Sequence, residues 1–155
     1  MTSLPFADTR DFDDARRGFI ATVPDAHTLT DTGDVAWTQR EHGFLQGEAP
    51  DTVNPSLWRM AQLNGTHGLF EVTERIYQVR GFSLANVTFI EGDIGIIVID
   101  PLQFTEHARA ALALYRAHRG NRPVSAVVYT HSHRDHYGGV RGVIGPDDLA
   151  RGVPV

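Results

Sequence analysis

The stretch VVYTHSHRDHYGG, from Val127 to Gly139, places four side chains that bind metal ions within six positions. They are His131, His133, Asp135 and His136, and they follow an apolar run directly. Side chains alternate along an extended chain, so the first two histidines should project to the same side and share one metal ion. The other two residues come after the chain begins to turn and suit a second ion. The pattern therefore predicts a metal site rather than a chance cluster of surface histidines.

The chemistry of these four side chains favours zinc. The sequence contains no cysteine, so imidazole and carboxylate groups must hold any metal ion. Such a set suits Zn²⁺ best, with Mn²⁺ or Fe as alternatives. Two metal ions about 3.5–4 Å apart can bridge a water molecule, lower its pKa and hold the attacking and leaving oxygens of a hydrolysis.

The sequence before the histidines predicts an α/β fold. IGIIVID, residues 94–100, is apolar on both faces, as is typical of a strand buried on both sides. A helix is expected over residues 105–119, with Thr105 as its cap, and a second apolar strand over 124–129. Strand, helix and strand in this order predict a right-handed parallel crossover. The histidines then lie beyond the carboxyl end of a strand, where open α/β sheets place their sites.

Asp100 ends the first of these strands and is followed by Pro101. Its carboxylate should emerge beside the end of the neighbouring parallel strand. There it can orient residues 130–136, called the histidine loop below, through hydrogen bonds. The alternative is an aspartate that only caps a turn or a helix. Five further histidines lack ligand spacing, and we expect no catalytic role for them: His27, His42, His67, His107 and His118.

Upstream of residue 94, three further strands are expected over 69–72, 76–79 and 84–90, joined by hairpin turns. The segment NPSLWRMAQLNG predicts a helix that Asn54 caps, with Pro55 at its first position. Before it the sequence is polar and irregular, and predicts only a helix over 11–22 and a short strand over 35–38.

The composition excludes some classes of function. Hydrophobic residues make up 41% and charged residues 21%, which is typical of a globular protein. The net charge is −5 and no long basic run occurs, which argues against nucleic-acid binding. The N-terminus lacks the pattern of a signal peptide, and no apolar run approaches the ~20 residues that span a bilayer. We therefore expect a cytoplasmic protein without stable membrane insertion.

HSHRDH, together with the strand that ends at Asp100, resembles the metallo-β-lactamase superfamily. Within it, three longer segments resemble the alkyl sulfatases of the SDS-hydrolase type: NPSLWRMAQLNGTHGLFEVTERIYQVRGF, NVTFIEGDIGIIVIDPL and VVYTHSHRDHYGGVRGV. The resemblance implies the first half of an αββα metallo-β-lactamase sandwich. The expected domains are an N-terminal extension, residues 1–53, and a truncated metallo-β-lactamase-like domain, residues 54–155.

The resemblance also implies a reaction, the hydrolysis of alkyl sulfate monoesters to an alcohol and sulfate by water activated between two zinc ions. His131 and His133 would hold one zinc ion, and Asp135 and His136 the other. Members of this family carry further ligands downstream and a helical dimerisation domain, so the full-length protein is expected to be a homodimer. The chain by itself would hold half of the active site, bind metal weakly and lack significant activity.

Two alternatives stay open. One is another hydrolase of the same fold that acts on thioesters, lactams or phosphodiesters. The acidic charge argues against the members that process nucleic acids, and the long extension against the glyoxalase-like members. The other alternative is an inactive remnant that only binds metal ions or a partner.

Overall fold

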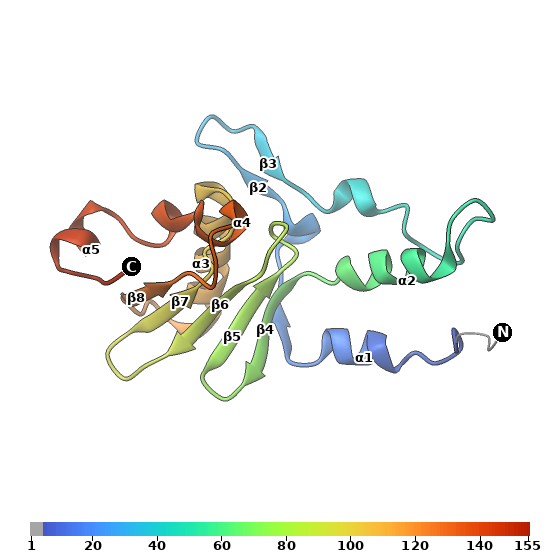
Figure 1. Ribbon diagram of the computed structural model, residues 1–155, viewed down its shortest axis with the longest axis horizontal. Helices are drawn as coiled ribbons and strands as arrows, with labels where there is room; N and C mark the ends of the chain where they lie inside the picture. Colours follow the sequence, from blue (N-terminus) through green and yellow to red (C-terminus); the bar gives the residue numbers. More distant parts are fainter. Residues whose placement is uncertain (1–4) are drawn as a thin grey trace.

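A single six-stranded sheet forms the centre of the protein in the computed structural model, which describes residues 5–155 (Figure 1). All neighbouring strands in it are antiparallel except β7 and β8, which run parallel. In spatial order the strands are β1 (Phe19–Ala21), β4 (Gly68–Thr73), β5 (Ile76–Arg80), β6 (Val87–Glu91), β7 (Ile96–Ile99) and β8 (Val124–Val128). Helix α3 (Thr105–Arg119) joins the two parallel strands, so the predicted parallel crossover is confirmed, while its handedness stays a prediction.

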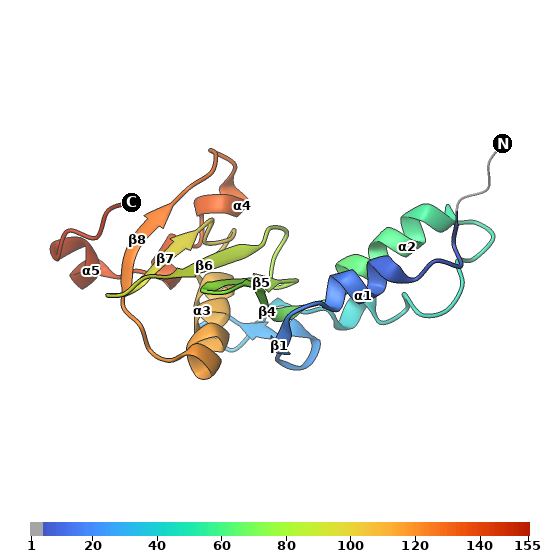
Figure 2. The same cartoon turned by 90° about the horizontal axis from the view of Figure 1, so that it is seen from below.

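Helix α3 covers one face of this sheet (Figure 2). Ala108, Leu112 and Tyr115 lie on its buried side, and the ring of Tyr115 stacks on Phe89 of β6 at 4.6 Å between centroids. One sheet with helices on one face is the first half of an αββα sandwich, and the predicted fold class is confirmed. The opposite face of β7 is only half-buried, so the expectation that residues 94–100 are covered on both sides is wrong for the part of the chain described.

Some element boundaries differ from the prediction. Strand β6 begins three residues later than expected, and strand β7 two residues later. Leu84 and Ile94, which were expected to begin these strands, lie exposed in the bends before them. Helix α3 begins where expected, but Phe104 occupies the cap position and Thr105 is the first helical residue. No side chain caps this helix, so the predicted cap is wrong.

The N-terminal region contributes a strand to the sheet that the sequence did not predict. Helix α1 (Arg10–Arg16) ends six residues earlier than expected, because Gly18 turns the chain with a φ of +72°. A Cβ atom at Gly18 would lie 2.0 Å from the carbonyl oxygen of Glu71, so only glycine permits this approach. Residues 19–21 then pair with β4 as strand β1, and the helix expected over 17–22 is wrong.

The next part of this region lies against α3. Strands β2 (Thr28–Leu29) and β3 (Val35–Trp37) form a hairpin that contacts this helix, between the short 3₁₀ turns η1 (Pro24–Ala26) and η2 (Arg40–His42). The strand predicted over 35–38 is confirmed. The domain boundary between residues 53 and 54 stays a prediction.

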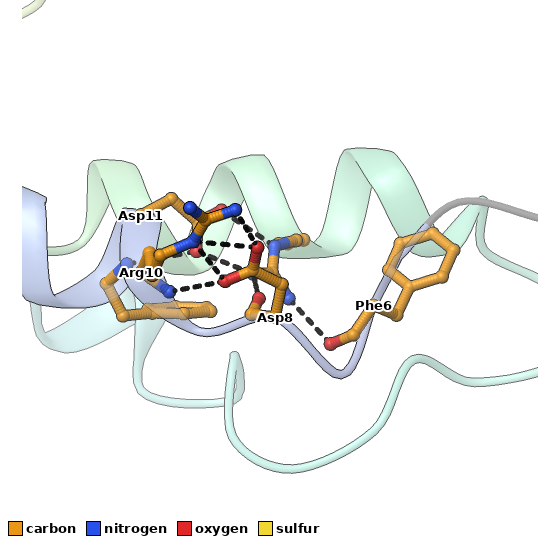
Figure 3. Close-up of polar contacts among 6 residues, drawn as sticks. Phe6, Asp8, Arg10 and Asp11 are labelled. Carbon is orange, nitrogen blue, oxygen red and sulfur yellow. Dashed lines mark hydrogen bonds and ion pairs between the residues drawn. The ribbon is translucent and has the colours of Figure 1, made fainter.

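Helix α2 (Pro55–Asn64) begins as expected, because the Asn54 side chain accepts hydrogen bonds from the backbone of Ser56 (2.9 Å) and Leu57 (3.4 Å). Helices α1 and α2 lie side by side and project away from the sheet (Figures 1 and 2). Arg59 of α2 joins them: it pairs with the Asp11 carboxylate and donates to the carbonyl oxygens of Phe6 and Asp8. Figure 3 labels these three partner residues.

After β8 the chain forms the short helices α4 (Arg134–Tyr137), η3 (Val140–Gly142) and α5 (Pro146–Ala150). Within residues 5–155, no helix is both long enough and apolar enough to cross a membrane.

Candidate metal centre

The parallel pairing of β7 and β8 brings Asp100 next to the histidine loop. Ile99 is opposite Val128 in the register, and the backbone N–H of Asp100 donates to the Val128 carbonyl oxygen at 3.0 Å. Both strands end at this edge of the sheet. Asp100 therefore follows β7 at the level at which Thr130 follows β8.

The Asp100 carboxylate holds the loop by three hydrogen bonds. Its Oδ1 accepts from the backbone N–H of Thr130 at 2.8 Å, and its Oδ2 accepts from the Thr130 hydroxyl at 2.7 Å. The same Oδ2 lies 2.8 Å from Nδ1 of His136. Burial raises the pKa of Asp100. The hydrogen bonds from Thr130 and His136 lower it by a larger amount, so the pKa lies below its ordinary value of 3.8. Asp100 is therefore a buried, charged anchor for this loop.

The backbone that carries this carboxylate is strained. Asp100 has a φ of +54° and Leu102 a φ of +62°, in the left-handed region that residues other than glycine rarely adopt. The N–H of Leu102 donates to the carbonyl oxygen of Asp100 at 2.7 Å across the intervening proline. Such conformations persist only where the surroundings enforce them, and they concentrate at functional sites.

Three imidazole rings of the loop lie in contact. The ring centroid of His131 is 4.7 Å from that of His133 and 3.9 Å from that of His136. His131 and His133 are exposed, whereas Asp135 and His136 are half-buried. His131 thus lies no closer to its predicted pair partner than to a member of the other pair.

The second predicted pair has a separation that suits zinc. Oδ2 of Asp135 lies 3.4 Å from Nε2 of His136. Two ligand atoms of a tetrahedral zinc ion, each about 2.0–2.1 Å from the metal, stand about 3.3 Å apart. Because Nδ1 of His136 faces Asp100, its Nε2 is the nitrogen left for a metal ion.

No three histidine, aspartate or glutamate side chains lie close enough together, anywhere in residues 5–155, to enclose one metal ion. The four predicted ligands thus lie near one another without forming a closed site. Their chemistry and the spacing of the Asp135–His136 pair fit zinc, for which imidazole and carboxylate are common ligands.

Helix α4 begins inside the histidine loop, at Arg134, and contains both Asp135 and His136. Gly138 and Gly139 follow it with ordinary negative φ values, so they serve close packing and not an unusual turn. A Cβ atom at Gly139 would lie 2.2 Å from the carbonyl oxygen of Pro101. The loop is thereby pressed onto the segment that follows β7.

Sequence reasoning assigned no role to two residues that support the loop. Thr130 binds Asp100 twice and lies 2.9 Å, through its Oγ1, from Nδ1 of His131. The guanidinium of Arg134 lies over the ring of Phe104, 5.1 Å from its centroid. The only sequence signal for Thr130 is its position directly between strand and histidines.

Two other histidines make side-chain hydrogen bonds that serve packing. His107 is buried, with Nδ1 3.0 Å from the Ser83 hydroxyl, and burial lowers its pKa. His67 bonds the Thr22 hydroxyl at 2.7 Å. These contacts join α3 and β4 to neighbouring segments and do not involve the histidine loop.

Comparison with known proteins places this arrangement in a family context. The profile of the Metallo-beta-lactamase superfamily matches residues 80–153. The alkyl/aryl-sulfatase BDS1 of Saccharomyces cerevisiae is 51% identical over 150 residues, which cover 96% of this chain and 23% of that protein. A linear primary-alkylsulfatase of Pseudomonas sp. is 52% identical over 154 residues, 98% of this chain and 23% of its own length.

A solved structure is similar as well. The stereoselective inverting sec-alkylsulfatase Pisa1 from Pseudomonas sp. superposes with a TM-score of 0.90 at 51% sequence identity. The match covers 98% of this chain and 24% of that one. The chain thus spans about a quarter of the length of the relatives it matches.

Proposed function

The chain belongs to the metallo-β-lactamase superfamily, and from this premise we propose that it supplies the first metal-binding loop of a zinc-dependent alkylsulfatase. The reaction is the hydrolysis of an alkyl sulfate monoester to an alcohol and sulfate. The chain spans 23% of the relatives' length, so catalysis is proposed for a complete site to which it contributes the histidine loop. A homodimer and a cytoplasmic location stay predictions.

The observation that carries this proposal is the anchored loop in a chain half-identical to alkylsulfatases. His131 and His133 are the proposed ligands of one zinc ion, and Asp135 and His136 those of the other. Asp100 orients His136 by holding its Nδ1. When bound, zinc lowers the pKa of a water molecule and stabilises negative charge on the ester.

The substrate class follows from what the relatives have in common. One is named for alkyl and aryl sulfates, one for linear primary alkyl sulfates and one for secondary alkyl sulfates. Each acts on a sulfate monoester, which is an anion. This chain has a net charge of −5, so attraction of such a substrate requires local positive charge, which two zinc ions would provide.

A chimera tests the proposal most directly. The matching segment of the Pseudomonas linear primary-alkylsulfatase is replaced by this chain, and sulfate release from dodecyl sulfate is measured with and without Zn²⁺. We expect zinc-dependent turnover that His133→Ala reduces by at least about a hundredfold. His118→Ala, which changes an exposed histidine on α3, should leave the rate unchanged.

The 155-residue chain provides the second arm of the test. It should bind zinc, measured by competition with a chelator, and release no significant sulfate. A chimera that folds and binds zinc but does not hydrolyse dodecyl sulfate would contradict the proposal and favour the inactive remnant. Turnover of a thioester, lactam or phosphodiester in place of the sulfate would favour the other hydrolases of this fold.

A further inference from the structure

Thr130 lies between the Asp100 carboxylate and the ring of His131. Its Oγ1 is 2.7 Å from Oδ2 of Asp100 on one side and 2.9 Å from Nδ1 of His131 on the other. The same Oδ2 is 2.8 Å from Nδ1 of His136. One carboxylate oxygen is therefore the end point of two hydrogen-bond paths, a direct one and one that passes through a hydroxyl group.

Counting protons along these paths fixes their direction. A carboxylate only accepts hydrogen bonds, and a threonine hydroxyl has one proton to donate. Since Thr130 donates that proton to Asp100, its Oγ1 can only accept from the His131 ring. Nδ1 of His131 must then carry a hydrogen. By the same reasoning Nδ1 of His136, which faces the carboxylate directly, carries one too.

A neutral imidazole with a hydrogen on Nδ1 has its lone pair on Nε2. We propose that Asp100 and Thr130 form a relay that fixes the tautomers of two histidines before any metal ion binds. The carboxylate acts on His136 directly and on His131 through the Thr130 hydroxyl. Thr130 is thus a positioning residue, because it acts on the metal site through the orientation of a ligand.

The relay reaches across both predicted zinc pairs. His131 belongs to one pair and His136 to the other, so a single buried carboxylate prepares one ligand of each. Within residues 5–155, the His133 ring has no such hydrogen-bond partner, although it lies only 4.7 Å from the ring of His131. His133 therefore serves as an internal reference whose tautomer the relay does not set.

The tautomers can be read in the metal-free chain. Long-range ¹H–¹⁵N correlation spectra of ¹⁵N-histidine-labelled protein, at about pH 8 where free imidazole is neutral, distinguish Nδ1–H from Nε2–H. We expect Nδ1–H for His131 and His136, and a mixture for His133. Thr130→Val should convert His131 to a mixture and leave His136 unchanged, whereas Thr130→Ser should restore the original spectrum.

Zinc affinity provides the second readout. Loss of the hydroxyl in Thr130→Val should weaken zinc binding about 10–100-fold, and Thr130→Ser should recover it. Thr73→Val makes the same change at an exposed position of β4 and should alter neither spectrum nor affinity.

Several results would overturn the relay. They are Nε2–H at His131 in the unsubstituted chain, one common set of shifts for all three histidines, and an unchanged His131 in folded Thr130→Val. The unsubstituted chain decides the matter by itself if Thr130→Val does not fold. The inference rests on the metal pairs of the proposed function, but the tautomers are measured without metal or substrate. A failure to hydrolyse alkyl sulfates would therefore contradict the function and leave the relay standing.

Discussion

Oδ2 of Asp100 lies 2.8 Å from Nδ1 of His136, although the two residues are 36 positions apart in the chain. The contact joins the end of β7 to α4 across the edge of the sheet. Asp100 makes this contact from a left-handed backbone conformation, with a φ of +54°. The strained turn and the contact that orients the histidine thus occur at the same residue.

Replacing Asp100 with alanine removes the acceptor of three hydrogen bonds and leaves their donors without a partner. We expect zinc affinity to fall about 10–100-fold and the free energy of unfolding of the metal-free chain to fall by about 2–4 kcal/mol. Chelator competition and urea denaturation measure the two effects. Asp93→Ala, which removes a 92% exposed carboxylate, is the matched control and should change neither. Undiminished zinc affinity in Asp100→Ala would show that the anchor does not prepare the ligands.

The sequence predicted the elements that local signals determine. Helix α2 could be placed because an asparagine cap and a first-position proline act within three residues. The crossover from β7 to β8 followed from two apolar runs around one amphipathic helix. The candidate ligand residues could be named because their spacing lies within a single loop.

What the sequence could not predict depends on contacts between distant segments. Strand β1 has only three residues and exists because it pairs with β4, while the apolar spacing of the same residues favours a helix. Thr130 is one threonine among many until the end of β7 lies beside it. The chain after α4 likewise packs closely, through Gly138 and Gly139, on the segment from Pro101 to Phe104, which lies far earlier in the chain.

Glu91 gives the stability of the fold a predictable pH dependence. Its side chain is only 4% exposed and accepts hydrogen bonds from Tyr115 (3.0 Å) and Arg119 (3.1 Å). Burial raises the pKa of Glu91. These bonds and the charges of Arg119 and Arg122 lower it by a larger amount, so the pKa lies below its ordinary value of 4.5. The unfolded chain therefore binds the proton more readily than the folded chain.

The stabilisation by Glu91 is accordingly complete above about pH 4.5 and is lost as the pH falls through the pKa of the folded state. Glu91→Gln should be less stable than the unsubstituted chain at pH 7, and this difference should shrink in acid. Urea denaturation of both proteins from about pH 7 to about pH 3 measures it. Glu74→Gln, in the exposed turn between β4 and β5, is the control. A difference that stays constant over this range would refute the prediction.

Gly139 should not tolerate a side chain. A Cβ atom there would lie 2.2 Å from the carbonyl oxygen of Pro101 and 2.6 Å from that of Phe104, both of them backbone atoms. Gly139→Ala should therefore push α4 away from Asp100, lower the free energy of unfolding by about 2–4 kcal/mol and weaken zinc binding. Gly145→Ala makes the same change where the nearest atom is 3.9 Å away, and should cost less than about 1 kcal/mol. Equal stability of the two variants would rule out close packing as the role of Gly139.

Arg59 should hold the N-terminal segment on α2 without supporting the sheet. Its guanidinium lies 2.8 Å, through Nε, from Asp11 and also donates to the carbonyl oxygen of Phe6 at 3.0 Å. Arg59→Ala should accelerate hydrogen exchange in α1 and leave the amides of β5 and β6 protected, because the hydrogen bonds of Arg59 within residues 5–155 go to residues 6, 8 and 11 and not to these strands. Arg59→Lys should restore little of the protection, since one ammonium group cannot make the several hydrogen bonds of the planar guanidinium.

Arg10→Ala is the control. It removes a side chain that is 86% exposed and should leave exchange in α1 nearly unchanged. Faster exchange throughout the sheet in Arg59→Ala would mean that α1 and α2 stabilise the whole fold and not only each other.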